Sequence, residues 1–178
     1  MRYLVTGSQM RAIDQDTIQN IGILSLVLME RAAECVARKA EQLCDQKTLQ
    51  ILAICGVGNN GADGVAAARM LYLHGFDVLV VVVGNEAHAT KEFEVQKGIA
   101  EKLEIPVVDW EHFLHGEDEQ KAGDRAIIDA VFGVGLSRDV EGTYAEVLDW
   151  INEAETEWVL AVDMPSGIHS DTGAVMGT

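Results

Sequence analysis

The sequence is poor in several residue types, and each scarcity excludes a class of protein. Only two prolines occur in 178 residues, no stretch is low in complexity, and 48% of the residues are hydrophobic. Such a chain is not intrinsically disordered and can bury a core without disulfides or structural zinc. Three cysteines, Cys35, Cys44 and Cys55, form no CxxC pair. We interpret them as buried thiols in a reducing compartment.

Basic residues are also scarce. Lys and Arg number 13 against 29 Asp and Glu, which gives a formal net charge of −16. Proteins that bind nucleic acid or anionic membranes depend on Lys and Arg to neutralise phosphates, so both partners are excluded. A phosphorylated ligand would have to be held mainly by backbone N–H groups and a few local cations.

Long apolar runs and boundary signals are absent as well. No run reaches the ~18–20 residues of a membrane span, and the first residues are not followed by the apolar core of a signal peptide. There is no internal repeat and no linker rich in glycine, serine or proline. We therefore expect one cytoplasmic domain over residues 1–178.

The first third of the chain is predicted to be helical. Ser8 is a candidate cap for a helix over 9–20, which Gly22 would end. A second helix is predicted over 24–44, because apolar residues recur there at helical spacing, namely Leu28, Ala32, Cys35, Val36 and Leu43.

Short apolar runs then alternate with helical patterns. Strands are predicted over 49–55, 76–83, 105–108, 125–131 and 158–163, and helices over 61–74, 90–103 and 141–153. Continuous apolar strands in repeated βα units indicate a mostly parallel sheet with helices on both faces. Ligands of such sheets bind beyond the carboxyl ends of the strands, and three motifs follow predicted strand ends.

The first motif is Gly56-Val57-Gly58-Asn59-Asn60-Gly61-Ala62-Asp63-Gly64. Its GxGxxG spacing is that of a dinucleotide-binding loop, whose glycines let the backbone approach a phosphate. A dehydrogenase of this kind also needs an acidic residue at the end of the second strand, whereas Asp77 lies at its start. The motif is thus either a tight turn or a loop whose Asn and Asp side chains meet polar ligand atoms or a cation.

The other two motifs also combine glycines with oxygen-bearing side chains. One is Asp129-Ala130-Val131-Phe132-Gly133 followed by a loop with Arg138, which either meets a phosphate or pairs with a nearby acid. The other is Asp163-Met164-Pro165-Ser166-Gly167. Asp163 is predicted to end a buried strand and to point its carboxylate to the carboxyl edge of the sheet.

Taken together, the three motifs resemble the YjeF N-terminal domain family, the NAD(P)H-hydrate epimerases. The resemblance covers nearly the whole chain and includes Met10-Arg11-Ala12-Ile13-Asp14 and Leu28-Met29-Glu30-Arg31-Ala32. It implies a three-layer, Rossmann-like α/β/α sandwich. It also implies a homodimer that interconverts the R and S forms of hydrated NADH and NADPH, with a fused or separate ADP- or ATP-dependent dehydratase as companion.

The resemblance also implies site residues. It places a potassium ion on Asn60, Asp129 and Ser166. It places the hydrated nucleotide against Asn59, Asn60, Gly61, Ala62, Asp63, Gly133, Val134, Gly135, Leu136, Ser137, Arg138, Asp139, Tyr144 and Asp163. Hard cations prefer such carboxylate, carbonyl and hydroxyl oxygens. Members of the family continue past the position of Thr178, so we expect a truncated domain that lacks the C-terminal strands.

Two other functions compete with epimerisation. A domain of this fold could bind a nucleotide without turning it over, as a scaffold module. An ordinary NAD dehydrogenase is disfavoured because the acid that holds the ribose is missing. For the epimerase we predict that Asp163 is the acid/base group, and that a nearby cation would favour its ionised form.

Overall fold

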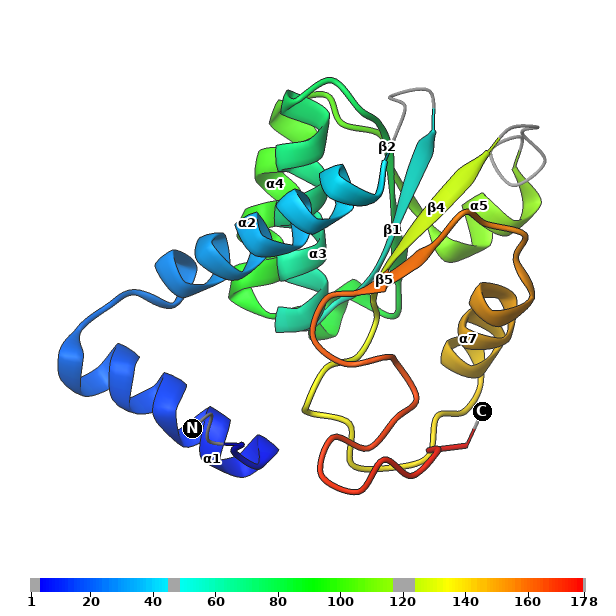
Figure 1. The fold of residues 1–178 in the computed structure, drawn as a ribbon. Helices are drawn as coiled ribbons and strands as arrows, with labels where there is room; N and C mark the ends of the chain where they lie inside the picture. Colours follow the sequence, from blue (N-terminus) through cyan, green and yellow to red (C-terminus); the bar gives the residue numbers. More distant parts are fainter. Residues whose placement is uncertain (1–3, 45–48, 117–123, 178) are drawn as a thin grey trace.

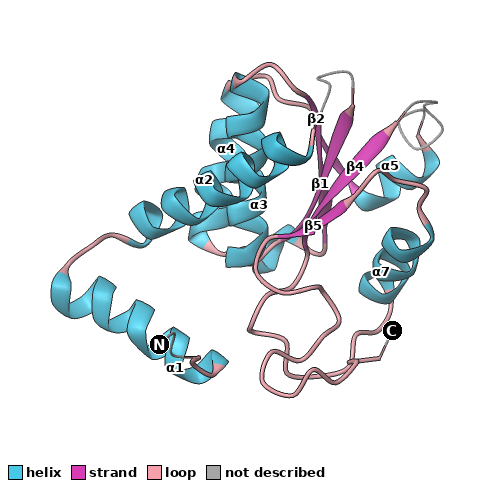
Figure 2. Cartoon of the chain, viewed as in Figure 1, coloured by secondary structure: helices cyan, strands magenta, loops and turns pink. Residues whose placement is uncertain are grey.

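Five parallel strands form the centre of the structure, a computed structural model that describes residues 4–44, 49–116 and 124–177 (Figures 1 and 2). Their order across the sheet is β3-β2-β1-β4-β5. β1 lies in the middle of the sheet, with β2 and β3 on one side and β4 and β5 on the other. The strand order therefore reverses beside β1, and the chain connections diverge there at the carboxyl edge of the sheet. The strands are β1 Gln50–Gly56, β2 Asp77–Val83, β3 Val107–Asp109, β4 Arg125–Ala130 and β5 Val159–Ala161.

Helices cover both faces of the sheet, which confirms the predicted three-layer sandwich (Figure 1). α2, α3 and α4 pack on one face, and α5 and α7 pack on the other. The helices are α1 Gly7–Asp16, α2 Ser25–Leu43, α3 Asn59–Leu73, α4 Lys91–Lys102, α5 Trp110–His115 and α7 Thr143–Glu153, with a π-helix at Thr17–Ile21 and a 3₁₀-helix at Glu86–His88.

The apolar strands are buried on both faces, as their composition predicts. Along β1, Ile51 and Ala53 belong to the core beneath α3, whereas Leu52 and Ile54 belong to the core beneath α5 and α7. The valines and Leu79 of β2 alternate between the same two cores. Successive side chains of a strand point to opposite faces, so two cores require apolar residues at every position.

The N-terminal helix differs from its prediction. Its cap is Thr6 and not Ser8: Thr6 Oγ1 accepts the Gln9 N–H at 3.2 Å, and the Gln9 side chain accepts the Thr6 N–H at 2.9 Å. This reciprocal pair is a capping box. The α-helical part is shorter than predicted, and the π-helix that continues it ends at Gly22, whose φ of 87° is left-handed.

The predicted apolar face of α2 was wrong by about one residue. The buried side chains are Met29, Ala33, Val36, Ala37 and Ala40, so of the predicted set only Val36 is buried. The small residues allow α2 to pack closely on α3. The cysteine interpretation was correct only for Cys55, since Cys35 is exposed and Cys44 is partly exposed.

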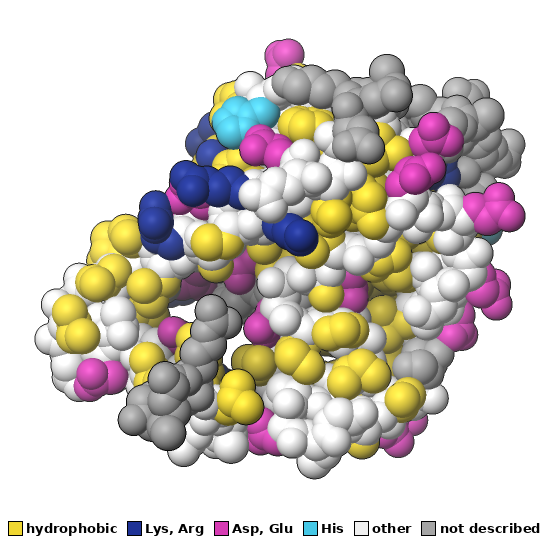
Figure 3. Space-filling view, in the orientation of Figure 1, with side chains coloured by type: hydrophobic (Ala, Val, Ile, Leu, Met, Phe, Trp, Pro, Cys, Tyr) yellow, Lys and Arg dark blue, Asp and Glu magenta, His cyan; other side chains and the backbone are white. Residues whose placement is uncertain are grey.

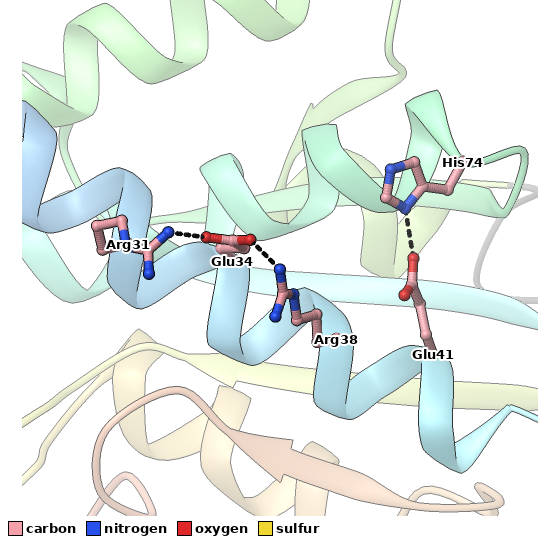
Figure 4. A network of polar contacts seen from close by, with 5 residues as sticks. All are labelled: Arg31, Glu34, Arg38, Glu41 and His74. Atoms are coloured by element: carbon pink, nitrogen blue, oxygen red, sulfur yellow. Dashed lines mark hydrogen bonds and ion pairs between the residues drawn. The ribbon is translucent and has the colours of Figure 1, made fainter.

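Charged side chains line the outer side of the α2–α3 contact (Figure 4). Glu34 pairs with Arg31 at 2.7 Å and with Arg38 at 2.5 Å, and Glu41 contacts His74 of the turn after α3. These pairs are largely exposed and contribute little to stability.

The later elements follow the predicted order with shifted ends. α3 begins at Asn59, so Asn59 and Asn60 lie in its first turn and not in a loop. β5 is shorter than predicted and partly exposed, and Asp163 lies two residues beyond it. α5 was not predicted; its Trp110 and Phe113 pack edge-on against Trp150 of α7 with ring centroids 5.7 and 5.3 Å apart. None of the described helices combines the length and apolarity needed to cross a membrane.

Candidate functional site

The candidate site lies at the carboxyl edge of the sheet, where the segments that follow β1, β4 and β5 meet (Figure 1). β2 lies on one side of β1, and β4 lies on the other. The segments that follow β1 and β4 therefore run toward opposite faces of the sheet. In parallel α/β sheets this point of reversal is where ligands bind.

Glycines allow the start of α3 to pack against the strand ends. A Cβ on Gly61 would lie 1.5 Å from the carbonyl oxygen of Gly56, and a Cβ on Gly64 would lie 2.3 Å from the Ala130 Cβ. No side chain fits in either place. The close turn that the GxGxxG spacing predicts is therefore present, and its glycines serve helix–strand packing.

Asp129 joins the second and third motifs. Its carboxylate is only 5% exposed and accepts three hydrogen bonds: from Ser166 Oγ at 2.5 Å, from the Ser166 N–H at 2.8 Å and from the Val131 N–H at 3.2 Å. Ser166 Oγ in turn accepts the Phe132 N–H at 2.8 Å. Burial raises the pKa of Asp129, and its hydrogen bonds from Ser166 and Val131 oppose that rise.

Asn60 and Asp163 meet over Gly133. A Cβ on Gly133 would lie 2.6 Å from Asp163 Oδ2 and 3.2 Å from Asn60 Oδ1, so a larger residue at this position would require these side chains to shift. Asp163 is exposed, and its Oδ2 accepts the Val134 N–H at 2.9 Å. The Nδ2 of Asn60 is buried without a hydrogen-bond partner. All three motifs thus contribute side chains to one small region.

Asp63 lies one turn further along α3 and is the most perturbed carboxyl group of the region. Its Oδ1 is buried and has no hydrogen-bond partner. Burial, followed by the negative charges of Asp163 and Asp14, raises the pKa of Asp63 to about 7. Asp14 belongs to α1 and was not among the predicted site residues. The sequence pattern around Asp14 does not show that α1 folds back toward α3.

The raised pKa of Asp63 predicts a dependence of stability on pH. Its pKa is higher in the folded protein (about 7) than in the unfolded chain (3.8). Protonated Asp63 therefore favours folding in full below about pH 3.8, and this contribution is lost as the pH rises through 7. Asp63→Asn removes the ionisable group, and we expect it to raise the free energy of unfolding at pH 8 by about 2–4 kcal/mol.

Urea denaturation of the wild type and Asp63→Asn at pH 4.5 and pH 8 measures this effect. The stability difference between the two proteins should be smaller at pH 4.5 than at pH 8. An equal difference at both pH values would show that Asp63 titrates normally.

The predicted nucleotide loop over 133–139 is partly exposed. Gly135, Ser137, Arg138 and Asp139 are exposed, and the turn closes where the Leu136 N–H donates to the Gly133 carbonyl at 3.2 Å. Among the described residues no ion pair involves Arg138, so the alternative of pairing with Asp139 or Glu141 does not occur there.

Tyr144 approaches the end of β2. Its ring packs against Phe132 with a centroid distance of 4.9 Å, and its hydroxyl lies 3.5 Å from the Val83 carbonyl. Gly84 accommodates the hydroxyl, since a Cβ there would lie 2.1 Å from Tyr144 Oη and the φ of Gly84 is 108°. Burial raises the pKa of Tyr144, and the positive charge of Arg138 opposes the rise.

Residues 25–178 match the sequence profile described as YjeF-related protein N-terminus. The chain belongs to this family. The YjeF-related resemblance stated from the motifs is thus confirmed over most of the chain.

Relatives within the YjeF-related family are similar over nearly the full chain. A protein of Limosilactobacillus fermentum named NAD(P)H-hydrate epimerase is 47% identical over 173 residues, which are 97% of this chain and 79% of the relative. Proteins with the same name from Limosilactobacillus reuteri and Oenococcus oeni are 43% and 40% identical, each over 98% of this chain and 79% of the relative.

A solved structure shows the same fold. The crystal structure of yeast ynu0 (YNL200c) matches with a TM-score of 0.83 at 23% sequence identity, over 98% of this chain and 75% of the yeast chain. At this identity the likeness concerns the fold alone.

Proposed function

We propose that this chain is an NAD(P)H-hydrate epimerase that interconverts the R and S forms of hydrated NADH and NADPH. The observation that carries this proposal is the 40–47% identity, over nearly the full chain, to relatives with that name. The convergence of three polar motifs at the reversal point of the sheet supports it, because this is where a nucleotide would bind.

The structure of the substrate limits the possible reaction routes. Its hydroxyl is on C6 of the nicotinamide ring, next to the ring nitrogen. Inversion can proceed by cleavage of the C6–O bond: the bonding electron pair leaves with oxygen, the oxygen takes up a proton as water, and the nitrogen lone pair forms an N1=C6 double bond. Water then adds to the other face of the cationic ring and releases a proton. Opening and reclosure of the ring is the alternative route, and both routes need a group that moves a proton.

Asp163 is our candidate for that group. It is exposed at the site and is held by the Val134 N–H, so its Oδ1 remains available to a ligand. An ionised Asp163 can accept the proton of the attacking water. Asp63 holds a proton more readily than an ordinary carboxyl group does, since its pKa is about 7, and it lies close enough to feel the charge of Asp163. The pair therefore combines a base with a neighbouring acid.

The nucleotide is assigned to two segments. α3 begins at Asn59, and the backbone N–H groups of Asn59, Asn60 and Gly61 precede the hydrogen bond from the Ala62 N–H to the Gly58 carbonyl at 3.0 Å. N–H groups at a helix start favour phosphate. The loop Gly133–Asp139 adds Arg138, a cation free of ion pairs within the described chain, beside Tyr144. This arrangement suits a phosphorylated ligand in a protein with net charge −16.

The residues assigned to potassium fit a hard monovalent cation. Asp129 supplies a buried carboxylate, Ser166 a hydroxyl in contact with it, and Asn60 an amide oxygen close to Gly133. The described residues contain no group of three His, Cys, Asp or Glu that could hold a metal ion, so a transition metal is a poorer fit. Bound potassium would supply a fixed positive charge that holds the three motifs together.

Chromatography of the R and S hydrates tests the proposal. The protein should speed their equilibration above the spontaneous rate, which is measured without protein and subtracted, and should do so faster in potassium than in tetramethylammonium buffer. Binding of the hydrates without faster equilibration would favour the non-catalytic nucleotide-binding module. No difference between the two cations would remove potassium from the proposal. The proposal also includes a homodimer, a companion dehydratase and a cytoplasmic location. Measurement of the molecular size tests the first, genomic context the second and cell fractionation the third.

A further inference from the structure

The start of helix α1 packs against the loops of the candidate site. Gly7 is the one buried residue of α1, and its N–H donates to Asp171 Oδ1 at 2.8 Å. The first N–H groups of a helix have no acceptor within the helix, so a carboxylate from another segment is a suitable partner. Asp171 belongs to the segment after β5, and this hydrogen bond therefore joins two segments that are 164 positions apart in the chain.

Gly7 also lies against Val134. A Cβ on Gly7 would lie 3.5 Å from both the Cβ and the carbonyl oxygen of Val134, and 3.0 Å from Ser170 Oγ. Val134 belongs to the loop assigned to the nucleotide, and its N–H donates to Asp163 Oδ2 at 2.9 Å. These contacts therefore lead from Asp171 through Gly7 and Val134 to the proposed base.

The loop after β4 is also fixed at its other end. The Val140 N–H donates to the Met176 carbonyl at 2.9 Å. The segment after β5 that provides this carbonyl is closed by an antiparallel bridge between Ile168 and Val175. The loop after β4 is therefore held at both of its ends, and the start of α1 is part of the support at the end that contacts the proposed base.

The rest of α1 adds little to this contact. Residues 8–16 are all exposed, and the space-filling view shows a hollow between α1 and the body of the protein (Figure 3). The packing of α1 on the site loops is therefore concentrated at Gly7. For this reason Gly7 and Asp171 can be changed without disturbing the packing of the other helices on the sheet.

We propose that Asp171 is a positioning residue for epimerisation: by holding Gly7 against Val134, it keeps the Val134 N–H directed at Asp163 Oδ2. The inference rests on the proposed function, and Asp171 is not among the site residues that the family resemblance implies. A base whose Oδ2 is held presents its Oδ1 to the substrate in a fixed direction, and small displacements of a reacting group lower the rate strongly. Asp171 thus acts through Asp163 and not on the substrate.

Two substitutions disturb this support from its two sides. Asp171→Ala removes the acceptor of the Gly7 N–H, and Gly7→Ala places a methyl group 3.0 Å from Ser170 Oγ and 3.5 Å from Val134. Each should lower kcat about tenfold, because the group that orients the base is displaced. Asp171→Asn keeps an oxygen that can accept the Gly7 N–H, so it should retain most of the wild-type kcat.

Asp16→Ala is the matched control. Asp16 is an exposed carboxylate on the same helix, and it accepts a hydrogen bond from the nearby Asn20 at 2.6 Å. The substitution removes the same charge from α1 without touching the contact with the site loops, so it should keep the wild-type kcat. The thermal unfolding midpoint of each variant is measured, and Gly7→Ala replaces Asp171→Ala in every comparison if the latter does not fold.

A double-mutant cycle with Asp163→Asn separates the positioning of the base from general support of the fold. Once the base is absent its orientation no longer matters, so Asp171→Ala should lower kcat by less than about twofold in the Asp163→Asn background. A merely structural role would lower kcat by the same factor in both backgrounds. kcat is obtained by chromatography of the R and S hydrates after subtraction of the spontaneous rate.

Two results would overturn the inference. One is a kcat within about twofold of the wild type for both Asp171→Ala and Gly7→Ala. The other is an equal loss of kcat from Asp171→Ala in the presence and in the absence of the Asp163 carboxylate. A wild type without epimerase activity would instead contradict the proposed function, so the two failures are distinguishable.

Discussion

Asp163→Asn is expected to slow epimerisation by about a hundred- to a thousandfold, because removal of a general base typically costs that much. The substitution keeps the size of the side chain and leaves an amide oxygen that can still accept the Val134 N–H. The exposed position of Asp163 makes a large loss of stability unexpected. The measurement is the equilibration rate of the purified R and S hydrates, together with the thermal unfolding midpoint.

Asp124→Asn provides the control for this experiment. Asp124 is exposed and directly precedes β4, so it lies at the amino edge of the same sheet, away from the site. It should retain wild-type activity. If Asp163→Asn also retains near-normal activity with an intact fold, Asp163 has no part in proton transfer.

Asp129→Ala should affect both stability and activity. The buried carboxylate accepts hydrogen bonds from Ser166 Oγ, the Ser166 N–H and the Val131 N–H, and alanine leaves these donors without their acceptor. We expect the free energy of unfolding to fall by about 2–4 kcal/mol. We also expect epimerisation to fall at least about a hundredfold, because the loops after β4 and β5 would no longer be fixed to each other.

Asp129→Asn separates the structural role of this residue from its assigned role as a cation ligand. Asparagine keeps the shape and one acceptor oxygen but carries no charge, so it should destabilise the protein less than alanine does. If Asp129 binds potassium, the dependence of the rate on potassium concentration should weaken strongly in this variant. An unchanged potassium dependence would show that Asp129 only ties the loops together.

Part of this architecture could be predicted because it depends on local patterns. Continuous apolar runs such as residues 49–55 and 76–83 identify strands buried on both faces, and their alternation with helices identifies a parallel sheet. Asn60, Asp129 and Asp163 were selected as candidates because each lies near or just after the carboxyl end of a predicted strand. Helix ends were less accurate: Thr6 and Ser8 are both good caps, and Gln9, which completes a capping box with Thr6, distinguishes them.

Features that depend on contacts between distant segments could not be predicted. The buried face of α2 is set by its contact with α3, and the short helix α5 is stabilised by the packing of Trp110 and Phe113 on Trp150. The glycines of the first motif were interpreted as a phosphate loop, yet Gly64 is also required by Ala130, which is 66 positions away in the chain.

The amino-acid sequence by itself determined the fold class, the family and the three motifs, because hydrophobic periodicity and residue spacing are local properties of the chain. Tertiary structure alone decided which side chains meet. It placed Asn60 and Asp163 over Gly133, joined Asp129 to Ser166, and brought the charge of Asp14 to Asp63. The physical reason is that burial and the electric field at a carboxyl group depend on neighbours in space, and these come from segments far apart in the sequence.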